Sequence, residues 1–107
     1  TKAAQLSLSR MFADRWADRG VRVNAVAPGP TSSPLWLAPG GLADQRAERE
    51  GISPDEAIER QTARVPLGRF GEPAEVAAVV AFLCSERASW VTGVAWSADG
   101  GTWQSML

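Results

Sequence analysis

The chain is 107 residues long, with 45% hydrophobic and 21% charged residues, which is the composition of an ordinary soluble globular domain. Its eleven basic and twelve acidic residues leave a formal net charge of −1, so the sequence offers no basic surface for nucleic acid. The longest apolar stretch, residues 76–84, is far shorter than the ~20 residues that a membrane-spanning helix needs. We therefore expect a cytoplasmic protein with no nucleic-acid partner and no membrane association.

Missing residue types restrict the chemistry. The sequence has no histidine, which excludes a Ser-His-Asp or Cys-His catalytic set and the usual Cys/His zinc clusters, so we expect no metal site. It has no tyrosine either. Acid–base catalysis near neutral pH would therefore use Lys, Asp, Glu or Cys, or residues outside this chain. The one cysteine, Cys84, lies in an apolar helical pattern and is predicted to be a small core residue.

The first segment, residues 1–19, has the pattern of an amphipathic helix, because apolar side chains recur every three or four positions. The members of this stripe are Ala4, Leu8, Met11, Phe12 and Trp16. The pattern begins without a capping residue, so we expect Thr1 to continue a helix that starts upstream. Gly20 is expected to end the helix, and the β-branched run over 21–27 predicts a strand.

The middle of the chain is rich first in Pro, Gly and Ser and then in charge, which predicts a long loop that leads into a weak helix over 42–50. A second helix should follow directly. Ser53 can cap it, Pro54 suits the first helical position, and Glu56 completes the pattern of a capping box. This helix is expected to end near Ala63.

The last third of the chain predicts one more helix and one more strand. Pro73 should open a helix that ends near Ser85. Its apolar residues cover most of its circumference, as expected for a helix packed on two sides; they are Val76, Ala77, Val79, Val80, Phe82 and Leu83. Residues 90–98 read as a strand interrupted by Gly93, and residues 99–101 as a turn.

Helices therefore alternate with strands, which is typical of a layered α/β protein with helices on the faces of a sheet. Two strands do not make such a sheet alone, because sheets of this class usually have about five or six. We expect the other strands to lie outside this chain.

Four groups of residues, in this order and spacing, carry a family resemblance. They are the sequences TKAA at 1–4, RVNAVAPGPT at 22–31, PLGRFGEPAEVA at 66–77, and VTG at 91–93 with DGG at 99–101. Together they resemble the C-terminal portion of the short-chain dehydrogenase/reductase family. The resemblance implies that residues 1–107 are part of one Rossmann-type domain with a doubly wound parallel sheet. It also implies NAD or NADP as cofactor and hydride transfer between a small-molecule alcohol and a carbonyl.

The resemblance assigns a catalytic role to Lys2. Members of the family have a catalytic tyrosine four residues before a lysine on one helix, and Lys2 matches that lysine, which puts the tyrosine upstream of Thr1. A neighbouring ammonium group favours the phenolate form of tyrosine. Lys2 would also hold the nicotinamide ribose hydroxyls. Without the downstream motifs, Lys2 would read as a solvated lysine at a frayed helix end.

The loop after the first strand is the second candidate site. Ligands of open α/β sheets bind beyond the carboxyl ends of strands, where Pro28, Gly29, Pro30 and Thr31 stand. The resemblance implies that the backbone near Thr31 meets the nicotinamide carboxamide, and Gly29 would permit a close approach. Ser33 stands where the family usually has a threonine that binds the pyrophosphate. The alternative is a Pro/Gly loop that only turns the chain. Asn24, on the strand, is expected to be structural.

The resemblance makes residues 34–62 the substrate lid. Its apolar residues Leu35, Trp36 and Leu37 would form a wall for the substrate. Its helical part also carries Arg46, Arg49 and Arg60, and Arg64 follows directly after it. These arginines either bind an acidic group of the substrate or are simply solvated.

The apolar helix that begins at Pro73 and the tryptophans near the last strand, Trp90, Trp96 and Trp103, predict a homodimer or homotetramer. The alternative is that other parts of the same subunit cover these faces.

Two further function classes stay open at this point: a family member without catalysis that serves as a binding or scaffold protein, and a self-contained helical interaction domain. We expect the chain by itself to be inactive, because the Gly-rich turn that binds dinucleotide phosphates is absent from it.

Overall fold

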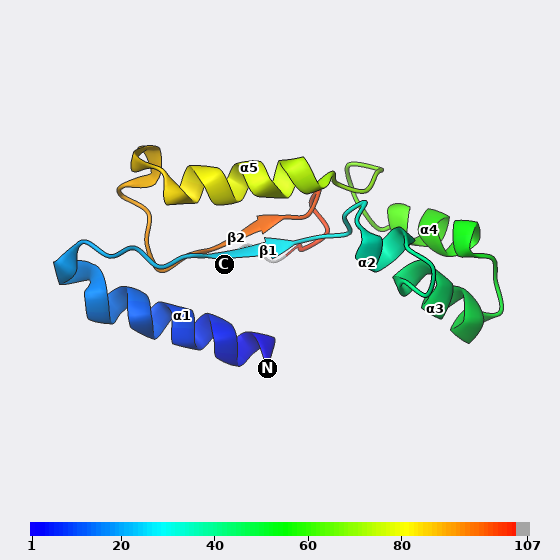
Figure 1. Cartoon of the computed structure of the whole chain (residues 1–107), viewed down its shortest axis with the longest axis horizontal. Coiled ribbons are helices and arrows are strands. Elements are labelled where there is room, and N and C mark those ends of the chain that lie inside the picture. Colours follow the sequence, from blue (N-terminus) through cyan, green and yellow to red (C-terminus); the bar gives the residue numbers. More distant parts are fainter. Residues whose placement is uncertain (105–107) are drawn as a thin grey trace. The chain divides into compact units, whose positions relative to one another are not determined.

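The computed structural model describes residues 1–104, which form two compact units (Figure 1). Unit 1 consists of residues 1–27 and 77–97, and unit 2 of residues 28–76 together with the chain from Ala98 onward. The strands β1 (Ala25–Pro28) and β2 (Ala95–Ala98) pair directly and run in the same direction (Figure 1). The helix α5 (Pro73–Cys84) starts in unit 2 and continues into unit 1. The predicted α/β class is therefore correct.

Unit 1 begins with the predicted amphipathic helix, α1 (Lys2–Trp16), which passes into a 3-10 turn, η1 (Ala17–Arg19). Gly20 ends it in the left-handed conformation, with φ of 72°, as the sequence predicts. The apolar stripe of α1 stays largely exposed, and the one buried residue of the helix, Ala13, lies outside the stripe. This face has no packing partner among the described residues of unit 1.

Both strands are shorter than predicted. The expected strands over 21–27 and 90–98 are reduced to β1 and β2, because side chains replace backbone partners at their starts. The Asn24 amide donates to the Val91 carbonyl (3.0 Å) and accepts from the Val94 amide (3.3 Å), and the Val23 amide donates to the Thr92 hydroxyl (3.1 Å). Asn24 is therefore structural, as predicted.

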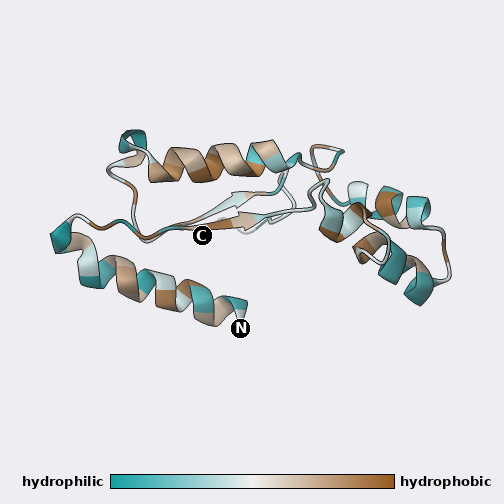
Figure 2. Ribbon diagram, viewed as in Figure 1, coloured by the Kyte–Doolittle hydropathy of each residue, from teal (hydrophilic) through white to brown (hydrophobic). Residues whose placement is uncertain are grey.

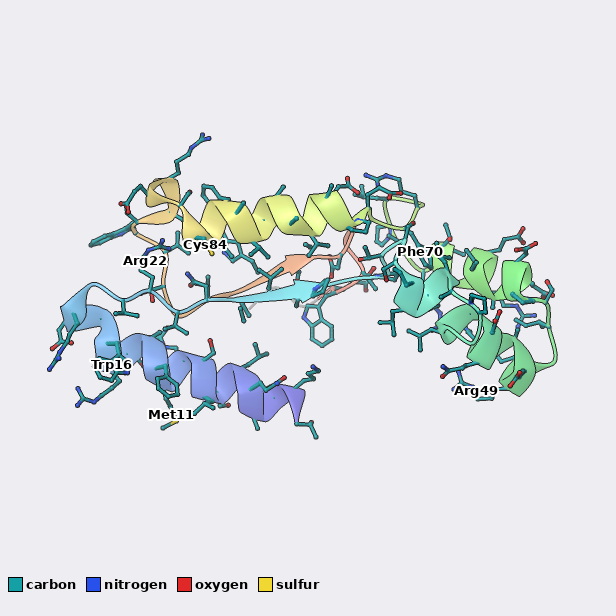
Figure 3. All side chains as sticks on the ribbon, viewed as in Figure 1. Met11, Trp16, Arg22, Arg49, Phe70 and Cys84 are labelled. Atoms are coloured by element: carbon teal, nitrogen blue, oxygen red, sulfur yellow. The ribbon has the colours of Figure 1, made fainter. Side chains whose placement is uncertain are left out.

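Arg22 joins the first strand region to the end of α5. Its guanidinium donates to the carbonyls of Leu83 (2.6 Å), Ser85 (3.2 Å) and Val91 (3.4 Å), and Figure 3 shows it near the carboxyl end of α5. The last carbonyls of a helix have no intrahelical donors, so a cation placed there satisfies them and offsets the helix dipole. The RVN sequence therefore fixes α5 against the strand pair.

Helix α5 carries apolar residues around most of its surface (Figure 2). One face packs on the strand pair, where Phe82 stacks on Trp96 at a centroid distance of 5.6 Å. Leu83 is its one buried residue, and Val80 is 43% exposed. Cys84, predicted to be a core residue, is exposed instead, since the face of α5 that carries it is not covered in unit 1. A 3-10 turn, η2 (Glu86–Ala88), follows.

Unit 2 holds the helices of the segment that the sequence predicts to be a lid. The helices α3 (Leu42–Glu50) and α4 (Pro54–Thr62) have the bounds that the sequence predicts almost to the residue, and a short helix that the sequence does not predict, α2 (Pro34–Leu37), precedes them. The Ser53 hydroxyl accepts from the Glu56 amide (3.1 Å), which is half of a capping box. The other half is absent among the described contacts, because the Glu56 carboxylate pairs with Arg60 (2.7 Å).

The core of unit 2 is built mainly from small residues, which lets α3 and α4 approach closely. Its buried members are Ala43, Ala47, Ala57, Val65 and Phe70. No helix in the described part of the chain is long and apolar enough to cross a membrane.

Candidate functional site

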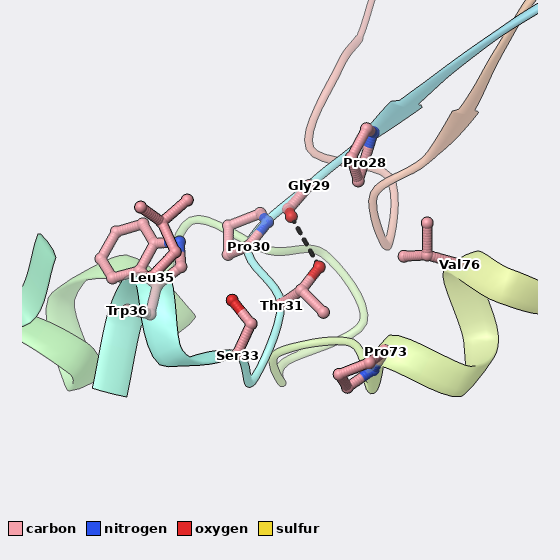
Figure 4. A pocket seen from close by; sticks show the side chains of 9 residues that line it. All are labelled: Pro28, Gly29, Pro30, Thr31, Ser33, Leu35, Trp36, Pro73 and Val76. Carbon is pink, nitrogen blue, oxygen red and sulfur yellow. Dashed lines mark hydrogen bonds between the residues drawn. The ribbon is translucent and has the colours of Figure 1, made fainter. Parts of the chain in front are cut away.

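The loop that follows β1 opens onto a pocket of about 570 Å³ in unit 2 (Figure 4). The five loop residues singled out from the sequence all line it: Pro28, Gly29, Pro30, Thr31 and Ser33. Four residues that were not assigned to the cofactor site complete the lining: Leu35, Trp36, Pro73 and Val76. The volume is typical of sites for small molecules. Unit 2 therefore brings the predicted loop and the start of the lid around one space.

A parallel bridge holds the loop in shape. The Ser32 amide donates to the Gly71 carbonyl (2.8 Å), and the Gly71 amide donates to the Pro30 carbonyl (2.9 Å). The Thr31 hydroxyl donates to the Gly29 carbonyl (2.9 Å), the bond drawn in Figure 4. Each bond removes freedom from a loop already stiffened by two prolines. The motif around Gly71 therefore stabilises the loop after β1. Neither sequence motif predicts this contact by itself.

Gly29 is required by a contact within the protein. A Cβ atom at this position would lie 2.6 Å from the Asp99 Cα atom and 2.7 Å from its Cβ atom, closer than real carbon atoms approach. The Gly29 amide also donates to the Ala98 carbonyl (3.0 Å). The sequence suggests that Gly29 makes room for a ligand; the structure gives the more direct reason that it makes room for the Asp99 turn.

The Asp99 turn is itself held by its side chain. The Asp99 carboxylate accepts from the amides of Gly101 (3.0 Å) and Trp103 (2.8 Å). Gly100 has φ of 62°, and its carbonyl accepts from the Leu67 amide (3.1 Å). The DGG sequence therefore fixes the backbone against which Gly29 packs, and in this way it stabilises the loop that lines the pocket.

Two donors in the loop are free to meet a ligand. Ser33 precedes α2 with an extended backbone, and its carbonyl accepts from the amides of Trp36 and Leu37 (3.0 Å each). Its hydroxyl makes no capping bond to the helix. Among the described contacts, the Thr31 amide donates no hydrogen bond either. The loop can therefore offer one amide and one hydroxyl in an otherwise apolar space.

Trp36, which lines the pocket, packs on Phe70, and Phe70 is flanked in the sequence by a residue of an ion pair. The Trp36 and Phe70 rings meet edge to face, with centroids 5.2 Å apart and an interplanar angle of 77°. Next to Phe70, the Arg69 guanidinium binds both carboxylate oxygens of Glu75 (2.7 and 2.8 Å), and the Glu72 amide donates to one of them (2.8 Å). The hydrogen bond from Arg69 and that from Glu72 lower the pKa of Glu75 to about 2.

Two of the arginines of the predicted lid, Arg46 and Arg60, are bound to other residues of that segment. Arg46, whose side chain is 14% exposed, binds Glu50 (2.8 Å) and Gln61 (2.8 Å). Arg60 binds Glu56 (2.7 Å) and Glu50 (3.3 Å). The hydrogen bond from Arg46 lowers the pKa of Glu50, and the charges of Arg46 and Arg60 add to the effect. These two arginines therefore already have acidic partners.

The other two arginines, Arg49 and Arg64, do not line the pocket. Figure 3 shows Arg49 on the helix α3, at a distance from Phe70. Lys2 lies in unit 1, in the first turn of α1, with its side chain exposed. Residues 1–104 contain no group of three or more His, Cys, Asp or Glu side chains that could hold a metal ion.

Parallel strands with helices, and a Pro/Gly loop at the carboxyl end of a strand, are typical of open α/β proteins, which bind ligands beyond the carboxyl ends of their strands. A family model described as Enoyl-(Acyl carrier protein) reductase matches residues 1–102. The chain belongs to the short-chain dehydrogenase/reductase family, and its fold is part of the Rossmann-type fold of that family.

Curated relatives and solved structures agree with this assignment. The chain is 43% identical to a tropinone reductase homolog of Arabidopsis thaliana over 94% of this chain and 33% of that protein. It is 40% identical to the 3-oxoacyl-[acyl-carrier-protein] reductase of Thermotoga maritima over 94% of this chain and 35% of that protein. It superposes on the L-sorbose reductase of Gluconobacter frateurii, crystallised with NADPH and L-sorbose, with a TM-score of 0.85 and 31% identity, over 99% of this chain and 40% of that one. The chain thus spans between a third and two fifths of the length of these relatives.

Proposed function

We propose that this chain is the C-terminal part of a cytoplasmic oxidoreductase that transfers a hydride between NAD or NADP and a small-molecule alcohol or carbonyl. The observation that carries the proposal is the pocket, which the loop Pro28–Ser33 lines in a member of this family. The NADPH named with the L-sorbose reductase structure supports the choice of cofactor.

The residues of the loop fit a nicotinamide ring. The pocket walls are apolar and suit a flat ring, while the Thr31 amide and the Ser33 hydroxyl are donors without partners among the described contacts. A carboxamide or phosphate oxygen needs such donors. The bound cofactor would supply or accept the hydride. The loop would orient the ring, since the Gly71 bridge and the Asp99 turn hold its backbone in place.

Lys2 supplies the charge for proton transfer. Its exposed ammonium group in the first turn of α1 is able to reach a partner one turn earlier on the same helix face. In the family a tyrosine stands there, upstream of Thr1. The ammonium favours the phenolate form of that tyrosine, which then exchanges a proton with the substrate oxygen. Lys2 also donates to the ribose hydroxyls of the cofactor.

The same proposal covers the lid and the assembly. Residues 34–62 close over the substrate and exclude water. The complete protein is a homodimer or homotetramer, in which α5 and β2 pack on a second copy; the exposure of Val80 on α5 (43%) and of Trp96 on β2 (38%) supports this. This chain alone does not bind NAD or NADP measurably, and calorimetry that finds micromolar affinity for the isolated chain would contradict that statement.

An isotope experiment tests the reaction. The complete protein is incubated with a panel of ketones and with NADPH or NADH carrying deuterium at the transferable position of the nicotinamide ring. Mass spectrometry of the alcohol product should find the deuterium on the carbinol carbon. A product without deuterium, or no product with any ketone and either cofactor, would refute the proposed reaction.

A further inference from the structure

We infer that the substrate of this enzyme is a carbonyl compound whose group next to the carbonyl is uncharged and apolar, and that Trp36 is the residue that selects it. This inference rests on the proposed function, because it names the substrate class of the same pocket. It goes beyond that function, since neither the family nor the cofactor fixes the chemistry of the substrate.

The first observation is the lining of the pocket. None of the side chains that line it in the described structure is ionisable, and Leu35 and Trp36 form the wall that the lid contributes (Figure 4). The Thr31 hydroxyl already donates to the Gly29 carbonyl (2.9 Å). The Ser33 hydroxyl makes no capping bond, and it is the donor proposed above for the cofactor. The described lining therefore leaves no charged side chain for the substrate, and such a space penalises a charge that finds no partner.

The second observation is that Trp36 is held in position. Its ring meets Phe70 edge to face at 5.2 Å, and Phe70 is buried with 9% exposure. The Arg69–Glu75 ion pair and the Gly71 bridge fix the backbone on either side of Phe70. A large side chain held by a rigid neighbour selects ligands by shape, because it cannot move aside without breaking its own packing.

The third observation removes the alternative of an acidic substrate. The lid arginines were the residues able to meet a carboxylate or phosphate, but Arg46 and Arg60 are paired with lid glutamates (2.7–3.3 Å). Neither Arg49 nor Arg64 lines the pocket. Arg46 and Arg60 do not line the pocket either, so the described lining offers a substrate anion no cationic partner.

The test uses three ketones of similar shape: methylcyclohexanone, which is neutral; oxocyclohexanecarboxylate, which is an anion; and piperidone, which is a cation. Reduction by the complete protein with its cofactor is measured for the wild type and for Trp36→Ala, Trp36→Phe and Leu37→Ala. Leu37 is the matched control: the sequence predicts it in the same apolar wall as Leu35 and Trp36, but this prediction is wrong, because Leu37 is exposed on α2 and does not line the pocket.

We expect the wild type to favour the neutral ketone over both charged ones by about 100-fold in kcat/KM, since an unpaired charge is costly to bury. Trp36→Ala should lower kcat/KM for the neutral ketone about tenfold or more and reduce the preference, whereas Trp36→Phe keeps most of both. Leu37→Ala should stay within about twofold of the wild type, as a surface substitution. Equal rates for charged and neutral ketones, or an unchanged preference in Trp36→Ala, would overturn the inference.

A binding measurement separates this inference from the proposed function. In protein labelled with nitrogen-15, the indole N–H resonance of Trp36 is identified by its absence in Trp36→Phe. Methylcyclohexanone should shift this resonance, and the two charged ketones should not. If no ketone is reduced but only methylcyclohexanone shifts the resonance, the proposed reaction is refuted, whereas the inferred class of ligand is supported. If the charged ketones shift it equally, or the neutral ketone does not shift it, the inference fails whatever the activity.

Discussion

The substitution Gly29→Ala tests how the loop after β1, which we propose to bind the cofactor, is held in place. The added Cβ atom would lie 2.6 Å from the Asp99 Cα atom and 3.0 Å from the Asp99 carbonyl oxygen, so backbone has to move. Overpacking of this kind costs about 1–3 kcal/mol. Alanine also lowers the conformational entropy of the unfolded chain, which offsets about 0.4–1 kcal/mol of this cost. We therefore expect the free energy of unfolding of the complete protein to fall by about 1–2 kcal/mol, with weaker binding of NADPH because the loop is displaced.

Gly71→Ala is the matched control. A Cβ atom there would have its nearest neighbours at 3.8 Å, and the residue belongs to the same bridge. Both variants are compared with the wild type by denaturant unfolding and by calorimetric titration with NADPH. If Gly29→Ala is no less stable than Gly71→Ala and binds NADPH equally well, the contact between Gly29 and Asp99 does not support the loop.

Four further predictions concern the rest of the chain. Arg22→Ala should cost about 1.5–3 kcal/mol in denaturant unfolding, because it removes charged hydrogen bonds from the end of α5; an unchanged midpoint would contradict this. The pKa of Glu75 is held at about 2, below its ordinary value of 4.5, so its stabilising effect is present above pH 4.5 and is lost as the pH falls toward 2; Glu75→Gln should lack this part of the acid transition. Hydrogen exchange in the lid, residues 34–62, should be faster than in residues 76–83 when no ligand is bound, and equal protection would count against a mobile lid. Light scattering should find a dimer or tetramer that Val80→Arg dissociates, and a monomeric wild type would exclude the interface.

Local patterns predicted the helices well. Each of these helices is predicted by residues within it or directly next to it. The features are the periodicity of α1, the charged run of α3 and the Ser53 cap of α4, and the structure has all three helices. Gly20 ends the 3-10 turn η1 that continues α1, so the helical segment stops at the residue that the sequence predicts. These features depend on neighbours in the sequence, so the sequence alone is sufficient to find them.

Long-range contacts were not predictable in the same way. The short strands arise because Asn24 binds Val91 and Val94, and the need for Gly29 arises from Asp99, each far away in the chain. Cys84 lies in an apolar sequence pattern, which predicts burial, yet it is exposed. Burial depends on which elements cover the helix, and a local pattern does not contain that information. The loop residues of the site were found through the family resemblance, whereas Pro73, Val76 and the bracing Phe70 required the folded chain.

The measurement that tests the central claim most directly is the rate of NADPH-dependent or NADH-dependent ketone reduction by the complete protein with Lys2 intact and with Lys2→Ala. We predict that kcat falls by orders of magnitude, about 10²- to 10⁴-fold, because the variant loses both the charge that favours the phenolate and the donor to the ribose. Thermal unfolding serves as the control for intact structure, since Lys2 is exposed. A Lys2→Ala protein that folds normally and keeps near-normal turnover would contradict the assignment of the site. A wild type that binds the cofactor but reduces no ketone would instead identify a family member without catalysis.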